Sequence, residues 1–270
     1  MTRPTDQDTR GIIDPRAGFE HFTLTRHEPS PGLAWAVDRY WIVRWDMPAG
    51  ECYEQRVIQH PAVHLVFEPG AATVQTISPH DFVRRLEGRG RAFGVKFRPA
   101  GFRPFLGGAV SAVAGRQLAA SEVFGTGVDD LCDVLRGDDS TSRSATAVEA
   151  FLRSLGTLPL PMTEPVNSVV DLIVADTSLS RVTDLAERLG ITTRKLQRLF
   201  ADHIGLGPKW VINRSRIHEA AEAATRRASI DWADLAAELG YSDQAHLVRD
   251  FTATVGTSPD RYTRRVAPRD

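Results

Sequence analysis

Seven polar side chains in the last third of the chain have chemistry suited to binding nucleic acid. They fall in two short stretches: Arg194, Lys195, Gln197 and Arg198 in the first, and Gln244, His246 and Arg249 in the second. An arginine can donate two hydrogen bonds to a guanine edge and a glutamine can pair with adenine, while lysine suits phosphate. A polar stretch is more often a solvated helix face. The pattern of the surrounding helices must therefore show whether these side chains contact nucleic acid or only form a solvated face.

A short apolar pattern occurs twice around these stretches. The first copy consists of Val182, Leu185, Ala186 and Leu189, followed by Gly190; fifty residues later the second consists of Trp232, Leu235, Ala236 and Leu239, followed by Gly240. Spacings of i, i+3, i+4 and i+7 predict one buried stripe on a short helix, and glycine suits the left-handed position that ends it.

Beyond each glycine the two copies continue in parallel, now 51 residues apart. The matching pairs are Leu196 and Leu247, Arg198 and Arg249, Phe200 and Phe251, Gly205 and Gly256, and Pro208 and Pro259. A helix, a turn with glycine and a second amphipathic helix form a helix-turn-helix unit, so the sequence predicts two such units. Residues 210–227 are expected to form the long helix between them.

Each second helix is predicted to have an inner and an outer face. The residues expected to point inward are Leu196, Leu199 and Phe200 in the first unit and Leu247 and Phe251 in the second. The candidate N-caps are Thr192 or Thr193, and Ser242 or Asp243. The seven polar side chains then lie on the outer faces, where the repeated context favours base contacts.

The first part of the chain has the pattern of short strands. Residues 41–45, 63–67, 72–77 and 92–97 are rich in β-branched and aromatic residues, and Pro/Gly segments separate them. This spacing is typical of a small barrel or sandwich. Helical spacing follows in residues 128–135 and 144–155, before the two prolines of residues 156–161 interrupt it.

The predicted fold is therefore α+β with two domains: a β-rich, barrel- or sandwich-like domain with following helices, then an all-α domain of two helix-turn-helix units joined by a long helix. We expect a flexible tail over residues 1–18, the β-rich sensor or dimerisation domain over 19–157, a linker over 158–163 and the helical domain over 164–270.

Charge and composition exclude several classes of protein. The net charge is −1, and residues 164–270 contain as many acidic as basic residues, so the chain is not a polycation that coats nucleic acid. Two cysteines are too few for a disulfide framework. No apolar run reaches the ~20 residues that span a bilayer, and no signal peptide is evident. We expect a cytoplasmic protein without membrane contact.

The repeated units closely resemble the AraC/XylS family of bacterial transcription regulators. The resemblance covers about 110 residues, and residues 240–251, with Gly256 to Pro259 and Tyr262 to Arg265, are similar to the C-terminal signature of that family almost position by position. It implies a module that reads two adjacent major-groove segments, mostly through Arg194, Gln197 and Arg198, with Gln244 and Arg249 assisting. Ala245 and Val248 depart from a strong base-reading pattern because neither can hydrogen-bond.

The same resemblance implies partners. The predicted partner is an operator in double-stranded DNA, bound by a homodimer whose two DNA-binding domains are repositioned by an effector or partner protein. RNA polymerase and an unidentified small effector are further candidates. Residues 93–102 are similar to the sensor region of one AraC-like subgroup, but the His-x-His pattern of metal-binding cupins is absent. No enzyme activity, cofactor or metal is predicted.

A metal site in the first domain is one alternative. His60, His64 and Glu68 lie at intervals of four, which would place them on one face of a helix. The valine-rich surroundings favour a strand instead, in which residues four apart are about 13 Å from each other. That separation is too large for a shared coordination shell.

A second alternative is a DNA-repair methyl acceptor at Cys52, since such acceptors can be fused to AraC-like modules. Cys52 lies between Glu51 and Glu54, and acidic neighbours disfavour a reactive thiolate. The Pro-Cys-His-Arg setting of those acceptors is also absent.

A third alternative is that the first domain only dimerises or contacts another protein, without a ligand. An apolar group after the last strand could line a pocket or fill a core, and core is favoured; its members are Phe102, Phe105, Leu106, Val110 and Val113.

Overall fold

A six-stranded antiparallel sheet forms the base of the first domain in the computed structural model, which describes residues 9–79, 82–136, 140–227 and 229–267. Its order is β1 (Phe22–His27), β2 (Val37–Asp46), β7 (Arg89–Phe97), β4 (His64–Glu68), β5 (Ala71–Gln75) and β8 (Gln117–Ala119). A second sheet pairs β3 (Cys52–Val57) with β6 (Phe82–Glu87). The predicted strands are present, and the arrangement is an open sandwich without a closed barrel among the described residues.

Two glycines in β7 create space for indole rings on the face between the sheets. A Cβ at Gly94 would lie 2.0 Å from the ring of Trp41, and one at Gly90 would lie 2.1 Å from that of Trp45. Both pairs are direct neighbours in the register of β2 and β7. Glycine within a strand thus lets another group approach the backbone closely, and here it positions two tryptophans.

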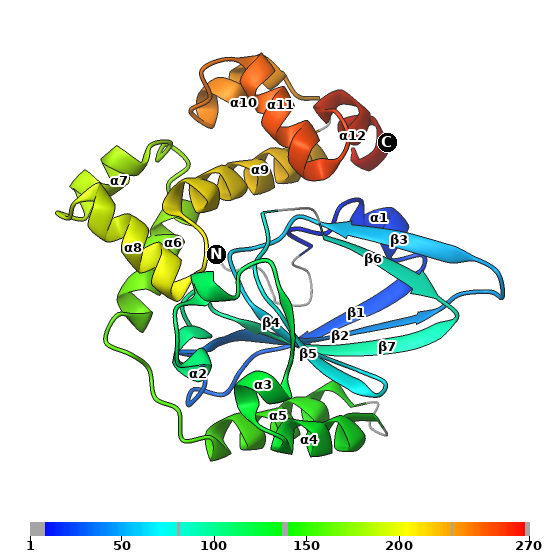
Figure 1. The fold of residues 1–270 in the computed structure, drawn as a ribbon. Coiled ribbons are helices and arrows are strands. Elements are labelled where there is room, and N and C mark those ends of the chain that lie inside the picture. The colour runs from blue at the N-terminus through cyan, green and yellow to red at the C-terminus, as the bar shows by residue number, and fades with distance from the viewer. Residues whose placement is uncertain (1–8, 80–81, 137–139, 228, 268–270) are drawn as a thin grey trace.

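Short helices cover the opposite face of the six-stranded sheet (Figure 1). They are α3 (Ser121–Phe124), α4 (Gly127–Arg136) and α5 (Thr141–Ser154), and they enclose the main core of the domain together with the sheet. Phe102 and Val110 are fully buried there, near α2 (Arg103–Leu106) and a 3₁₀ turn, η2 (Val110–Ala112); Phe105, Leu106 and Val113 pack against the same cluster. This apolar group therefore belongs to the core.

The prediction of a flexible tail over residues 1–18 is wrong for residues 9–18. Pro15–Gly18 form the short helix α1, capped by the side chain of Asp14, and Ile12 bridges Val57 of β3. Ile13 is buried, 6% exposed, against the C-terminal helices. Because the segment is mostly polar, its sequence does not show that Ile13 packs against helices near the other end of the chain. Residues 1–8 lie outside the described residues.

The C-terminal domain is helical, as predicted. It contains α6 (Thr163–Ala175), α7 (Val182–Arg188), α8 (Thr193–His203), α9 (Pro208–Arg226), α10 (Trp232–Glu238), α11 (Gln244–Val255) and α12 (Pro259–Val266). Residues 155–162 connect it to α5 without helix or strand. Figure 1 shows α9 between two groups of helices, with α7 and α8 near one end and α10 to α12 near the other. None of the described helices combines the length and apolar character needed to cross a membrane.

Candidate functional site

The first helix-turn-helix unit consists of α7 and α8. Thr192 caps α8 by accepting a hydrogen bond from the backbone N–H of Lys195 at 3.2 Å. Leu196 and Phe200 are 1% and 0% exposed, and they pack into a core shared with α6 and α9. The opposite face is open to solvent, and all four predicted polar residues of this unit are exposed there: Arg194, Lys195, Gln197 and Arg198.

The second unit, α10 and α11, is built in the same way. Asp243 caps α11 through the backbone N–H of His246 at 2.7 Å, a bond that lowers the pKa of the Asp243 carboxyl. Leu247 and Phe251 are both fully buried. Gln244 and Arg249 are exposed, as predicted.

His246 differs from the other six candidate side chains because it is only partly exposed. Its Nδ1 lies 3.2 Å from the Ser242 hydroxyl, and its Nε2 lies 3.6 Å from a carboxylate oxygen of Asp250. The ring therefore has two partners within its own unit. It is the least available of the seven for contact with DNA.

A buried arginine attaches the second unit to α9. Arg216, 3% exposed, donates a hydrogen bond from Nε to the carbonyl of Leu239 at 2.6 Å. Its guanidinium also lies 3.4 Å from the centre of the Tyr241 ring, a cation–π contact. Both partners border Gly240, the turn between α10 and α11. The orientation of α11 is therefore coupled to that of α9.

The first domain contacts α6 and the first unit through Ile77 and Ala100, which share their apolar core, and through polar groups. Asn167 of α6, fully buried, accepts a hydrogen bond from the backbone N–H of Ala100 at 2.9 Å. Arg98 forms an ion pair with Glu164 at 2.7 Å, and Arg103 forms one with Asp202, near the end of α8, at 3.2 Å.

The first domain also contacts α9 and the second unit. The His60 ring stacks on that of His218 in α9, with centroids 4.2 Å apart, and Arg10 forms an ion pair with Glu219 at 2.6 Å. Arg265 of α12 pairs with Asp14 at 3.0 Å. Burial lowers the pKa of both imidazoles, that of His218 to about 3, so the stacked rings are neutral at pH 7.

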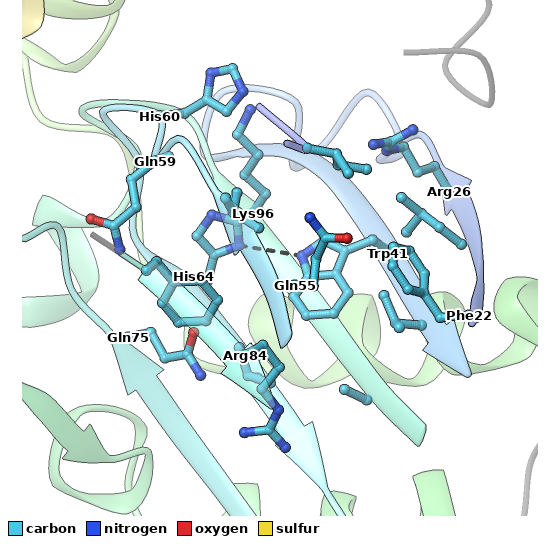
Figure 2. A pocket seen from close by; sticks show the side chains of 18 of the residues that line it. Phe22, Arg26, Trp41, Gln55, Gln59, His60, His64, Gln75, Arg84 and Lys96 are labelled. Atoms are coloured by element: carbon cyan, nitrogen blue, oxygen red, sulfur yellow. Dashed lines mark hydrogen bonds between the residues drawn. The ribbon is translucent and has the colours of Figure 1, made fainter. Parts of the chain in front are cut away.

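A cavity of about 230 Å³ lies between the two sheets of the first domain, and we call it the central cavity. Trp41 and His64 form part of its wall, and the Trp41 indole N–H donates a hydrogen bond to His64 Nδ1 at 3.3 Å (Figure 2). Burial lowers the pKa of His64 to about 3, with a further contribution from Lys96. His60 and Arg10, which contact α9, line this same cavity.

The three residues considered for a metal site have other partners. His60 lies in a loop and its Nε2 is 3.1 Å from the carbonyl of Arg10, His64 is bonded to Trp41, and Glu68 pairs with Arg84. No cluster of possible metal ligands occurs among the described residues. Cys52 is exposed at the start of β3.

Two sequence families match separate parts of the chain. Residues 185–265 match a family described as a helix-turn-helix domain, and residues 25–119 match one described as a domain of unknown function, DUF6597. The HTH-type transcriptional regulator Rv1931c of Mycobacterium tuberculosis is 31% identical over 87 residues, 32% of this chain and 33% of that protein. The uncharacterised HTH-type regulator YfiF of Bacillus subtilis is 32% identical over 82 residues, 30% of this chain and 26% of that protein. The chain matches about a third or less of the length of these relatives.

These matches fall on the repeated units described above, and they confirm the resemblance found in the sequence. The chain carries an AraC-type helix-turn-helix domain. Among solved structures, ToxT from Vibrio cholerae is similar over 92% of this chain and 98% of that one, with 11% identity and a TM-score of 0.40. Both curated relatives are named as HTH-type transcriptional regulators.

The sequence did not reveal how the AraC-type domain meets the first domain. The stacked His60 and His218 are 158 residues apart. The spacing of His60 with His64 suggested a metal site instead of this contact, and no local pattern marks His218. Asn167 appears in the sequence as an ordinary polar position on a helix. The one available signal was the apolar Ile12–Ile13 pair in an otherwise polar segment, which indicates a buried anchor.

Proposed function

We propose that the protein is a sequence-specific regulator of transcription that reads two adjacent major-groove segments with α8 and α11. One observation carries this proposal: two capped helices of the same build, joined by α9, each bury an apolar face and expose arginine and glutamine. Arg194, Gln197 and Arg198 are assigned most of the base contacts, with Lys195 suited to phosphate. Gln244 and Arg249 assist from the second unit.

Local charge supports this assignment although the domain has no net charge. Arg194, Lys195 and Arg198 follow one another on the first turns of α8, and phosphate contact requires cations on one face rather than over the whole domain. Binding is therefore expected to depend on salt with a modest slope. A regulator of this type acts in the cytoplasm, where its DNA is located.

The same proposal assigns control to the first domain. His60 and Arg10 line the central cavity and also contact α9, the helix that joins the two DNA-reading units. An effector in the cavity that moved either residue would change the position of α9. In a homodimer this change would alter how the two AraC-type domains are placed on an operator, and hence their contact with RNA polymerase.

Selection of binding sites from random DNA by the full chain tests the proposal. We expect an enriched site with two short conserved blocks, their centres about one helical turn apart. The enriched duplex should bind at least a thousandfold more tightly than a scrambled one of equal composition. Equal affinity for both, or enrichment of a single short block, would contradict two-segment reading.

A further inference from the structure

The two helix-turn-helix units touch each other directly, in addition to their shared connection through α9. The loop between α6 and α7 lies beside the end of α10 (Figure 1), where Gly240 forms the turn of the second unit. A Cβ at Gly240 would lie 3.0 Å from the Cβ of Ser180 and 3.3 Å from its hydroxyl oxygen. The backbone of the second unit therefore lies against a residue that comes just before α7.

The matching turn of the first unit has no such neighbour. Gly190 has a φ of +63° and Gly240 a φ of +67°, so both take the left-handed conformation that ends the preceding helix. A Cβ at Gly190 would meet no neighbouring atom of the described residues within 4 Å. Turn geometry thus explains a glycine in both units, whereas close approach to another element is specific to Gly240.

Two cations of α9 hold the two sides of this contact. Lys209, in the first turn of α9, donates a hydrogen bond to the carbonyl of Ser180 at 3.3 Å. Arg216 comes seven residues later, on the same face of the helix, and donates to the carbonyl of Leu239 at 2.6 Å. Asp250 of α11 attracts both cations. One face of α9 thus binds the loop before the first unit and the turn of the second.

The loop that carries Ser180 is itself anchored in the first unit. Leu179 is buried in the apolar core that contains Leu185 of α7 and Leu196 of α8. Asp176, which follows α6, accepts a hydrogen bond from the backbone N–H of Ser178 at 3.1 Å. Because this anchored loop leads directly into α7, a displacement of Ser180 requires α7 to move, and α8 is packed on the same core.

We propose that Ser180, Gly240 and Lys209 form an inter-unit brace that fixes the separation of the two base blocks that the protein accepts. This inference rests on the proposed function, since the separation matters only if α8 and α11 both read DNA. With α9 as the sole link, rotation about residues 204–207 would let α11 follow a block that is shifted along the duplex. The brace prevents this rotation, because the units must first separate at Ser180.

A change of one base pair between the two blocks tests such a brace directly. It moves the second block about 3.4 Å along the duplex and rotates it by about 35° around the axis. If the units are held rigidly, contact with a shifted block is lost as completely as contact with a scrambled one. If they move independently, α11 follows the shifted block and part of the affinity is kept.

Titration of the full chain against variants of its selected duplex measures this difference. One set of duplexes lengthens or shortens the spacer between the blocks by one base pair, and a reference duplex has a scrambled second block. We expect scrambling to weaken binding by about tenfold or more, and each altered spacer to weaken it by the same factor to within about twofold. Because each result is a ratio of affinities, a general change in DNA affinity cancels.

A matched pair of glycine variants locates the brace. Asparagine tolerates the left-handed conformation, but in Gly240→Asn its side chain lies against Ser180 and forces the units apart. The preference for the original spacer should fall from about tenfold to about threefold or less. Gly190→Asn makes the same demand on the backbone in open space and should keep the preference of the parent chain. Lys209→Met loses the bond to the Ser180 carbonyl and should lower the preference by a smaller factor.

A measurement without DNA tests the brace independently of DNA reading. Spin labels are attached at Glu187→Cys in α7 and Ala237→Cys in α10, two exposed positions, in the full chain with Cys52 and Cys132 replaced by serine. Double electron–electron resonance should give one narrow distribution of distances for the parent and for Gly190→Asn, and a broader one for Gly240→Asn. Circular dichroism and thermal melting establish that each variant is folded.

Several outcomes would overturn the inference. They are undiminished affinity for an altered spacer when scrambling of the second block weakens binding, the parent's preference in Gly240→Asn or in Lys209→Met, an equal change in Gly190→Asn, and a broad distribution of distances in the parent. If scrambling the second block has no effect, two-segment reading is wrong and the proposed function fails. The distance measurement then decides on the brace alone, so the two failures are distinguishable.

Discussion

The two helix-turn-helix units have the same interior and different surfaces. Phe200 and Phe251 occupy matching positions and are both fully buried, and each recognition helix starts at a side-chain cap. The outer face of α8 exposes four hydrogen-bonding residues. That of α11 exposes Gln244 and Arg249, while Ala245 offers no hydrogen bond and His246 is partly engaged within its own unit. The two units therefore share the buried residues of their cores and differ on the outer faces that are proposed to read DNA.

The units also differ in how the first domain holds them. The first domain contacts α6 and the first unit through a buried amide at Asn167, through ion pairs at Glu164 and Asp202, and through Ile77 and Ala100, which belong to the same apolar core. The second half, with α9, is contacted through Ile13 and through the stacked imidazoles of His60 and His218. Because the central cavity adjoins the second set of contacts, a ligand there is expected to act first on α9 and the second unit.

Removal of either matching phenylalanine has the largest expected effect and tests whether the interiors are equivalent. Phe200→Ala and Phe251→Ala should each lower the free energy of unfolding by about 3–5 kcal/mol, because each leaves a cavity in a closed core. Urea denaturation of the full chain measures both. A difference of more than about 2 kcal/mol between them would show that the two interiors are not equivalent.

Replacement of the matching arginines tests whether the surfaces differ. Arg198→Ala should cost about 1–3 kcal/mol of binding to the selected duplex and relax specificity at one base pair. Arg249→Ala should cost less, since the second unit has fewer groups that hydrogen-bond to bases. Gel-shift titrations against a set of single-base operator variants measure affinity and specificity together.

Arg188→Ala is the matched control, because Arg188 is an exposed arginine of α7 that pairs with Asp176. It should leave specificity unchanged. If Arg198→Ala weakens all duplexes equally, Arg198 contacts phosphate rather than a base. If Arg249→Ala has the larger effect, the assignment of most base contacts to the first unit is wrong.

Local, repeated patterns made the helical domain predictable from the sequence. Leu185, Leu196 and their counterparts recur at helical spacing, and Thr192 and Asp243 are among the N-caps that the sequence predicts. Side chains on the outer faces of α8 and α11 followed from the same periodicity, and six of the seven candidates are exposed.

The central cavity and the domain contacts were not predictable, because they depend on residues far apart in the chain. Lys96 and Asp38 meet only when β2 and β7 pair, and His60 meets His218 only when the two domains pack. Gly90 and Gly94 indicate in the sequence a close approach within a strand, but not that tryptophans occupy the space. The periodicity of apolar residues shows which face of a helix or strand is buried, but it does not show which residues pack against that face.

The two caps give the smallest effect and the sharpest distinction between the units, because only one of them titrates. Thr192→Ala should lower the free energy of unfolding by about 1 kcal/mol at any pH at which the chain is folded. Asp243→Ala should also destabilise at pH 7, but its effect should shrink in acid. The pKa of Asp243 is lowered in the folded chain, so its stabilisation is present above the unfolded pKa near 3.8 and is lost as the pH falls through the folded value.

Urea denaturation of both variants and the parent chain at steps from pH 7 towards pH 3 measures this difference. Comparison with the parent at each pH removes the contribution of the buried histidines, which all three proteins share. A constant effect of Asp243→Ala across this range would mean that the carboxylate charge contributes nothing to the cap. A pH-dependent effect of Thr192→Ala would mean that the stability of the first unit is coupled to a titrating group. The difference between the two units would then come from their contacts with the rest of the chain and not from their N-caps.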